Sequence, residues 1–327
     1  MDAVATQPHG LPLLATTQTC SGRTYIVTGA NTGLGFEAAK HLVALDAAKF
    51  ILAVRNVAAG DTAKTTIEEA TGKTGVAEVW ALDLASYESV KVFANRVIAE
   101  LERVDALIEN AAVAMSGGPL VEGHVATITV NVISTLLLGV MLLPKLSESA
   151  KKLGILPHIA IISSRAGFDA REEWDKIKDD PLTKMDAGDV GGLKSYPLSK
   201  LLETLAVRQL ASLVPLSRTG VVLNLVCPGF CNTELRRNVP ANFREFIATQ
   251  EAKFGRTAED GSRTLLHGAI AGKESHGRFL DSCEIADDKV PDWVTDEEGS
   301  KWQKNLWDII VKELETIEPG CVKEVLN

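Results

Sequence analysis

The chain has 327 residues, 46% of them hydrophobic, which is enough to bury one large core or two modest ones. Its formal net charge of -9 and isoelectric point near 5.3 argue against nucleic acid or an anionic membrane as partner, because both need clustered Lys and Arg. Five cysteines without a Cys-x-x-Cys pair predict reduced thiols and a cytoplasmic location. Cys227 and Cys231 have no His neighbour at metal-ligand spacing, so no metal site is predicted.

Residues 1–21 are expected to form a flexible arm. They contain a Leu-Pro-Leu-Leu patch, but not the basic start and long apolar run of a signal peptide. The longest apolar run of the chain, Leu136 to Leu143, is shorter than the ~20 residues that span a membrane. We therefore expect a buried helix there and no membrane partner.

The first informative stretch is Arg23 to Gly35, RTYIVTGANTGLG, in which an apolar run breaks into three glycines and a helical periodicity follows. This pattern predicts a strand, a tight loop and a helix. Gly29, Gly33 and Gly35 allow the backbone to approach a ligand closely, and the helix start offers unpaired N–H groups to a pyrophosphate. An ordinary strand-to-helix connection is the alternative interpretation.

Strand and helix patterns then alternate to the end of the chain. Strands are expected at residues 25–27, 49–54, 76–82, 104–108, 158–162, 219–226 and 278–280. Helices are expected at 57–72, 86–103, 123–153 with a bend at Pro144, 197–214 and 257–271, besides the one that starts at Gly35. The alternation predicts an α/β fold with a Rossmann-type doubly wound parallel sheet of about seven strands, in one domain covering residues 22–327.

In such a sheet the ligand lies at the carboxyl ends of the strands. Arg55 follows the second strand, 20 positions past Gly35. An NAD enzyme would place an acid here on the ribose 2′-hydroxyl, and an NADP enzyme a cation on the 2′-phosphate. Arg55 therefore favours NADP(H) as cofactor, although it could be an ordinary surface arginine.

Hydride transfer to a carbonyl needs a proton donor, and a tyrosine suits this role when a nearby ammonium lowers its pKa. Tyr-x-x-x-Lys places the two groups one helical turn apart. Two such pairs occur, Tyr87 with Lys91 and Tyr196 with Lys200. We favour Tyr196 and Lys200, because their helix follows the fifth strand, whereas Tyr87 begins the helix on the adenine side.

With Thr28 in front, the glycine loop reads TGANTGLG and resembles the TGxxxGxG cofactor loop of the short-chain dehydrogenase/reductase family. The resemblance extends over about residues 22–280. It implies that the cofactor contacts Gly29, Asn31, Thr32, Gly33, Leu34, Gly35, Arg55, Asp83, Leu84, Asn110, Ala111, Tyr196, Lys200, Pro228, Gly229, Phe230 and Thr233. Asp83 could equally be a turn residue, and the Pro228-Gly229 pair could be a simple turn.

The resemblance also implies the remaining catalytic groups. Ser164, the second serine of SSRAG, would donate a hydrogen bond to the substrate oxygen. Ser163 is its rival, because neighbouring residues of a strand face opposite ways. Asn131 would relay protons to Lys200 through water, unless its amide simply bonds a helical carbonyl.

Within the family the likeness is closest to retinol-dehydrogenase-like and fungal secondary-metabolism reductases, from GANTGLG, AVRN, YPLSKL and RTAEDG. Glu109 and Ala112 depart from the family pattern Asn-Asn-Ala-Gly, and Ala112 requires a negative φ. Ser164 and Tyr196 lie 32 positions apart, which makes residues 168–194 an insertion or lid. Pro197 predicts that the helix begins there, with Tyr196 at its cap.

The insertion is expected to be a mobile cover. Its apolar residues Trp174, Ile177, Leu182 and Met185 would form a roof over a large hydrophobic ketone, opposite Phe230, Phe243 and Phe246. Residues 232–256 are expected to form the substrate loop, and 281–327 a C-terminal extension. A solvated surface excursion is the alternative for residues 168–194.

The sequence thus predicts an NADP(H)-dependent oxidoreductase that interconverts a bulky hydrophobic carbonyl compound and its alcohol. A non-catalytic NADP-binding scaffold and an epimerase with the same Tyr and Lys are the alternatives. The resemblance implies that the apolar helices 123–153 and 197–214 form the interface of a homodimer. The C-terminal extension could instead cover the same faces.

Overall fold

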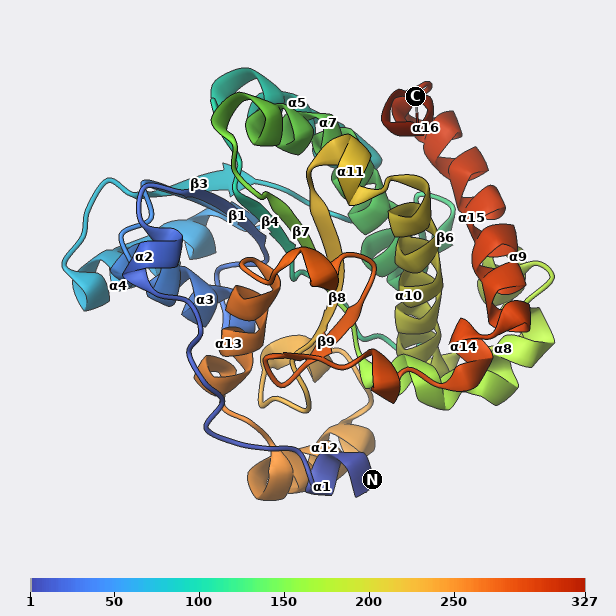
Figure 1. Ribbon diagram of the computed structural model, residues 1–327. Coiled ribbons are helices and arrows are strands. Elements are labelled where there is room, and N and C mark those ends of the chain that lie inside the picture. The colour runs from blue at the N-terminus through green and yellow to red at the C-terminus, as the bar shows by residue number, and fades with distance from the viewer. Residues whose placement is uncertain (1, 327) are drawn as a thin grey trace.

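An eight-stranded sheet crosses the middle of the computed structural model, which describes residues 2–326 (Figure 1). In spatial order its strands are β10 (Glu284–Ile285), β9 (Phe279–Asp281), β8 (Val222–Cys227), β7 (His158–Ile162), β4 (Ala106–Glu109), β1 (Thr24–Thr28), β2 (Lys49–Val54) and β3 (Ala77–Ala81). Every pairing is parallel except that of β10 with β9. The predicted doubly wound parallel sheet is confirmed, and β10 adds one short antiparallel strand.

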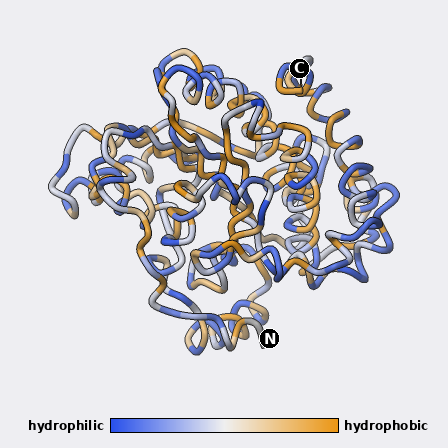
Figure 2. Tube along the Cα trace, viewed as in Figure 1, coloured by the Kyte–Doolittle hydropathy of each residue, from blue (hydrophilic) through white to orange (hydrophobic). Residues whose placement is uncertain are grey.

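Helices cover both faces of the sheet. Successive side chains of a strand point to opposite faces, and in these strands both sets are apolar, so both faces must be shielded from water. In β1, Tyr25 and Val27 belong to the core on one face and Ile26 to the core on the other. The first face carries α3 (Gly33–Ala44), α4 (Val57–Thr71) and α13 (Ala258–Gly268). The second carries α5 (Tyr87–Glu100), α7 (Thr135–Leu153) and α10 (Ser195–Leu213). Figure 2 shows the hydrophobic residues gathered along the central strands.

The apolar helix on the second face is continuous from residue 126 to 153 and changes its winding near its start. It comprises α6 (Ala126–Ile128), the π-helical segment η1 (Thr129–Ser134) and α7, with Pro144 inside α7. By length and composition it could span a membrane, but 89% of its most hydrophobic window is buried inside the fold. It is a core helix, as the sequence predicts.

The C-terminal extension packs along the second face. It contains α14 (Asp292–Thr295), α15 (Glu297–Ile317) and α16 (Cys321–Leu326). Helix α15 runs beside α10 and α16 lies against α7 (Figure 1). Its buried residues include Trp302, Leu306, Trp307, Ile310 and Leu314. The same chain therefore covers much of the helix surface that the resemblance would assign to a second copy.

The insertion between Ser164 and Tyr196 is folded and joins the core. It forms the 3₁₀ helix η2 (Arg165–Ala170) followed by α8 (Arg171–Ile177) and α9 (Pro181–Ala187). Trp174, only 1% exposed, meets the ring of Trp302 edge to face with centroids 5.9 Å apart.

The predicted apolar roof over the substrate is therefore wrong. Its four members, Trp174, Ile177, Leu182 and Met185, are all buried in the core cluster that α15 shares. The physical reason is that α15 supplies the apolar surface these side chains need, and no local pattern links residues 168–194 to a helix more than 100 positions later.

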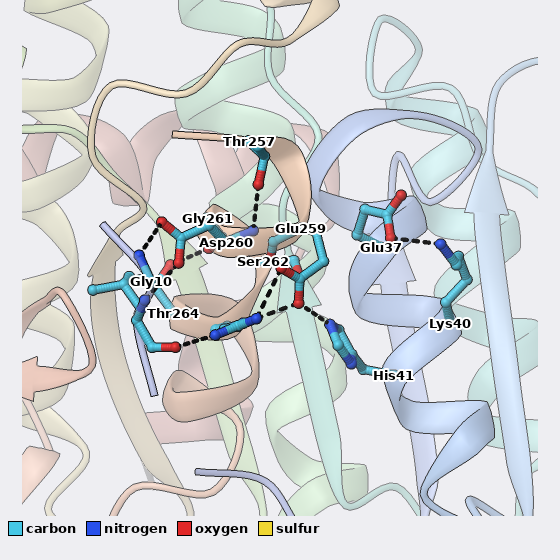
Figure 3. Close-up of polar contacts among 12 residues, drawn as sticks. Gly10, Glu37, Lys40, His41, Thr257, Glu259, Asp260, Gly261, Ser262 and Thr264 are labelled. Carbon is cyan, nitrogen blue, oxygen red and sulfur yellow. Dashed lines mark hydrogen bonds and ion pairs between the residues drawn. The ribbon is translucent and has the colours of Figure 1, made fainter. Parts of the chain in front are cut away.

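The N-terminal arm lies along α13. It contains the short helices α1 (Asp2–Ala5) and α2 (Thr17–Cys20). Between them, the backbone N–H groups of Gly10 and Leu11 donate to the Asp260 carboxylate at 3.1 and 2.6 Å, and Figure 3 shows Asp260 facing Gly10. The same turn of α13 reaches α3, where Glu259 lies 2.9 Å from His41.

Candidate active site

The glycine loop after β1 has the geometry of an anion site. Gly29 and Gly33 have φ angles of 67° and 59°, in the left-handed region that favours glycine. A Cβ at Gly35 would lie 2.7 Å from Nδ2 of Asn110, so the loop closes only with glycine there. Thr32 precedes α3 without a side-chain cap bond, which leaves the first N–H groups of the helix to a ligand. These residues fit a pyrophosphate.

A cavity of about 450 Å³ lies beside this loop, between the starts of α3 and α4. It is lined by Asn31, Thr32, Gly33, Phe36, Ala59, Thr62, Ala63 and Thr66. Arg55 is exposed at the end of β2, and its neighbour Asn56 caps α4 by accepting from the Ala59 N–H at 3.1 Å. The cavity therefore adjoins the glycine loop, where the sequence predicts a dinucleotide, and Arg55 is open to solvent.

Residues after β4 bond to Thr28, at the start of the glycine loop. Asn110 Nδ2 donates to the Thr28 carbonyl at 2.9 Å, and the Ala111 N–H donates to Thr28 Oγ1 at 2.9 Å. Asp83 Oδ1 accepts from the Ala85 N–H at 3.0 Å, which is a contact typical of a turn residue. Ala112 is not among the described residues with positive φ, which agrees with the requirement placed on it.

Ser164 and Tyr196 meet at the carboxyl end of β7. Ser164 Oγ accepts from the Ala166 N–H at 3.2 Å, and its hydroxyl is placed to hydrogen-bond with Tyr196, which lowers the pKa of the phenol. Ser163 faces the core instead, with Oγ 2.9 Å from Oγ1 of Thr204. The geometry thus gives the outward position to Ser164.

Close packing of η2 on α10 brings these two groups together. A Cβ at Gly167 would lie 2.8 Å from the backbone nitrogen of Leu201, so only glycine allows the approach. Helix α10 begins at Ser195, two residues before the predicted start at Pro197. Pro197 is tolerated because first-turn N–H groups have no partner within the helix, and Tyr196 consequently lies in that turn.

Lys200 lies one helical turn after Tyr196, and its ammonium is held by groups other than the phenol. Its ammonium donates to the Ile162 carbonyl at 2.6 Å and to Oε1 and Oε2 of Glu203 at 2.9 and 3.1 Å. Burial raises the pKa of the Tyr196 phenol, while the charges of Lys200 and Arg236 lower it. Lys200 therefore acts on Tyr196 electrostatically, through space.

Asn131 lies in the π-helical segment η1 and is fully buried. Its Oδ1 accepts from the Val113 N–H at 2.9 Å, and its Nδ2 donates to the Val113 carbonyl and to Ser199 Oγ, each at 2.9 Å. None of these contacts is with a carbonyl of its own helix, which was the alternative role considered for this amide. The side chain ties the loop after β4 to α10, next to Lys200.

The loop after β8 closes the site from the other side. Gly229 has a φ of 81°, and Thr233 lies over the glycine loop, 3.6 Å from where a Cβ of Gly33 would stand. Beyond it, α12 (Ala241–Phe254) has no buried residue, and Phe246 is 47% exposed. The exposed segment near the site is thus 232–256, the predicted substrate loop, and not the insertion.

The second Tyr/Lys pair is engaged elsewhere. Lys91 lies 3.0 Å from Glu88 and 3.9 Å from Glu318 of the C-terminal extension. The Tyr87 hydroxyl is buried without a hydrogen-bond partner among residues 2–326, and burial raises its pKa. This pair is not at the corner that holds Ser164 and Tyr196.

Two buried acids lie at the site that were not predicted from the sequence to be functional. Glu109 ends β4 and Glu203 lies inside α10, and both are buried. The available signal was an acid within an otherwise apolar strand and another among the leucines of a core helix, since lone charges are rarely buried.

Comparison with known proteins gives consistent matches. A family model described as short chain dehydrogenase matches residues 23–175. The chain is 41% identical to the short chain dehydrogenase/reductase dmxR8 of Cryptosporiopsis sp. over 92% of this chain and 93% of that protein. It is 36% identical to the short-chain dehydrogenase anuD of Penicillium roqueforti over 91% of this chain and 79% of that one.

Solved structures share the fold. One is described as a short chain dehydrogenase of Shigella flexneri complexed with NADP, with a TM-score of 0.59 and 21% identity over 82% of this chain and 99% of that one. Another is the 3-ketoacyl-(acyl-carrier-protein) reductase of Brucella melitensis complexed with NADH, with a TM-score of 0.59 and 20% identity over 80% and 97%. At these identities the likeness shows the fold alone.

Proposed function

Because the chain belongs to the short-chain dehydrogenase/reductase family of oxidoreductases, we propose that it reduces a carbonyl compound to an alcohol with NADPH, or catalyses the reverse. The observation that carries the proposal is the meeting of Ser164 and Tyr196 above Lys200, at the end of β7. These groups and the glycine loop lie at the same edge of the sheet, where a doubly wound fold binds its ligand.

The division of labour follows from the chemistry of each side chain. The nicotinamide ring, when bound, supplies or accepts the hydride. Tyr196 donates a proton to the oxygen that becomes the alcohol, and Ser164 donates a hydrogen bond to the same oxygen as its charge grows. Lys200 favours the phenolate that remains, because its positive charge lowers the Tyr196 pKa. Asn131 is proposed to hold the proton path beside it.

The preference for NADP(H) is supported by Arg55, which is exposed at the end of β2, directly before Asn56, the N-cap residue of α4. A guanidinium there can bind the 2′-phosphate of NADP through two charge-assisted hydrogen bonds. Solved structures of the same fold carry NADP in one case and NADH in another, so the preference rests on this residue.

A bulky hydrophobic substrate is supported by the segment after β8. Phe230 and Phe243 are partly exposed and Phe246 is largely so, on a segment whose helix α12 buries no residue. Phenylalanine rings on a loosely packed segment can close over an apolar ligand. The likeness to fungal secondary-metabolism reductases agrees with such a substrate.

The test is NADPH oxidation against aldehydes, quinones, aromatic ketones and polycyclic ketones. Tyr196→Phe should reduce turnover by ~10²-fold or more while the cofactor still binds, since it removes only the transferable proton. Tyr87→Phe is the matched control and should leave the rate unchanged. Equal rates in both variants, or no NADPH oxidation with any compound, would favour the non-catalytic scaffold.

A further inference from the structure

A cluster of three buried ionisable residues lies close to Tyr196, and two of them, Lys200 and Glu203, act on its pKa. Lys200 is 2% exposed and Glu203 is 1% exposed, and the Lys200 ammonium touches both carboxylate oxygens of Glu203. Glu109, from the neighbouring strand β4, is 4% exposed and is close enough for its ionisation to respond to both Glu203 and Lys200. The cluster thus holds one cation and two acids.

The two acids differ in their partners. Glu203 is paired with Lys200, whereas neither oxygen of Glu109 has a hydrogen-bond partner within residues 2–326. Glu109 Oε1 instead faces Gly139 of α7, where a Cβ would lie 3.4 Å away. An ionised carboxylate without partners is costly in such a place, so Glu109 carries a proton and Glu203 carries the charge.

We propose that Glu203 is a positioning residue that holds Lys200 beneath Tyr196 and limits the positive potential that Lys200 exerts on the phenol, with Glu109 as a neutral acid behind the pair. The proposal rests on the proposed function for the role of Tyr196. Glu203 lies on the same helix as Lys200, one turn further on, so its carboxylate stays within reach of the ammonium. Lys200 also bonds to the Ile162 carbonyl of β7, which fixes it from the second side.

The directions of the pKa shifts agree with this arrangement. Burial raises the pKa of Glu203 to about 7, against the lowering effect of Lys200. Burial, and then the charge of Glu203, raises the pKa of Glu109 well above its usual range, again opposed by Lys200. The charged groups that act on the Tyr196 pKa are Lys200, Arg236 of η4 (Glu234–Arg236) and Glu203, of which only Glu203 raises it.

The chain offers a direct readout, because it has only three tyrosines. Burial raises the pKa of all three phenols, so the transition of Tyr196 is identified by comparison with Tyr196→Phe. A tyrosinate absorbance titration of the full-length protein should therefore contain one transition that belongs to Tyr196. Tyr196→Phe should abolish it, which assigns the signal.

Glu203→Gln should move this transition to lower pH by about one unit, the low end of what a single buried charge produces. Glu203→Asp keeps the charge and should restore a midpoint near that of the wild type. Glu109→Gln is the matched control: it replaces a neutral acid by a neutral amide and should leave the midpoint unchanged. An unchanged midpoint in Glu203→Gln, or an equal shift in Glu109→Gln, would overturn the proposal.

A second measurement covers the case in which Glu203→Gln does not fold. Infrared difference spectra of the wild type at about pH 9, well above the pKa of about 7 of Glu203, should contain the C=O band of a buried protonated carboxyl, and Glu109→Gln should lose it. A band that persists in Glu109→Gln would contradict the assignment of the proton. Neither measurement needs turnover, so a failure of the proposed reductase activity and a failure of this inference remain distinguishable.

Discussion

The side-chain amide of Gln7 forms two hydrogen bonds with the backbone of Phe230, 223 positions further along the chain. Its Nε2 donates to the Phe230 carbonyl at 2.9 Å, and the Phe230 N–H donates to its Oε1 at 2.8 Å. Nε2 also donates to the Phe254 carbonyl at 2.6 Å. One residue of the N-terminal arm thus joins both ends of the proposed substrate segment.

Gln7→Ala should loosen this segment. Gln7 is 6% exposed, and its loss removes the partner of the Phe230 N–H and of the Phe254 carbonyl, at a local cost of about 1 to 3 kcal/mol. Hydrogen exchange of residues 228–256 should become faster. Gln18→Ala, at an exposed position of α2, is the control and should have no effect. Unchanged exchange in Gln7→Ala would show that the arm does not restrain the segment.

Arg55→Ala should reduce the preference for NADPH over NADH. The lost charge-assisted contact with the 2′-phosphate corresponds to about 1 to 3 kcal/mol, and Arg55→Asp should reverse the preference. Dissociation constants for both cofactors measure this by fluorescence titration. Lys64→Ala, which removes another cation from α4, should leave the ratio unchanged. Equal binding of both cofactors by the unmodified protein would contradict the assignment of Arg55 to the 2′-phosphate.

Trp174→Ala should act on stability and not on substrate affinity. Trp174 is buried against Trp302, so truncation leaves a cavity and should lower the free energy of unfolding by about 3 to 5 kcal/mol. Urea denaturation measures the loss. Trp293→Ala, at a partly exposed position, should cost less. A small loss of stability with a raised KM for bulky substrates alone would restore the idea of a substrate cover.

His158 should make stability fall in acid. It is buried in β7 with Nε2 2.7 Å from the Ala271 carbonyl, and burial lowers its pKa to about 4, from 6.5 in the unfolded chain. Between these values the unfolded chain binds more protons, so stability is present above pH 6.5 and is lost as the pH falls toward 4. The loss from this group is about 3 kcal/mol.

Urea midpoints measured across that pH range check this expectation. His158→Gln has no group that titrates there and should show a flatter profile, whereas His9→Gln, at an exposed position, should follow the wild type. Parallel profiles for the wild type and His158→Gln would attribute acid sensitivity to other groups.

The sequence by itself determined the sheet and the loops that form the site. Strands β2 and β7 are found at residues 49–54 and 158–162, as expected, because continuous apolar runs of this length are buried on both faces of a parallel sheet. Gly35 could be recognised as a site of close approach, because only glycine lacks the Cβ that would collide there. Such signals are local and can be read from neighbouring residues.

Only the tertiary structure decided which side chains face each other across the fold. The position of Trp174 depends on a helix more than 100 residues later, and that of Gln7 on a loop 223 residues away. The partners of Lys200 come from its own helix and from β7, and the unpartnered Glu109 lies behind them. Contacts of this kind leave no periodic pattern in the sequence, because burial and pairing depend on packing between distant segments and not on the residues beside them.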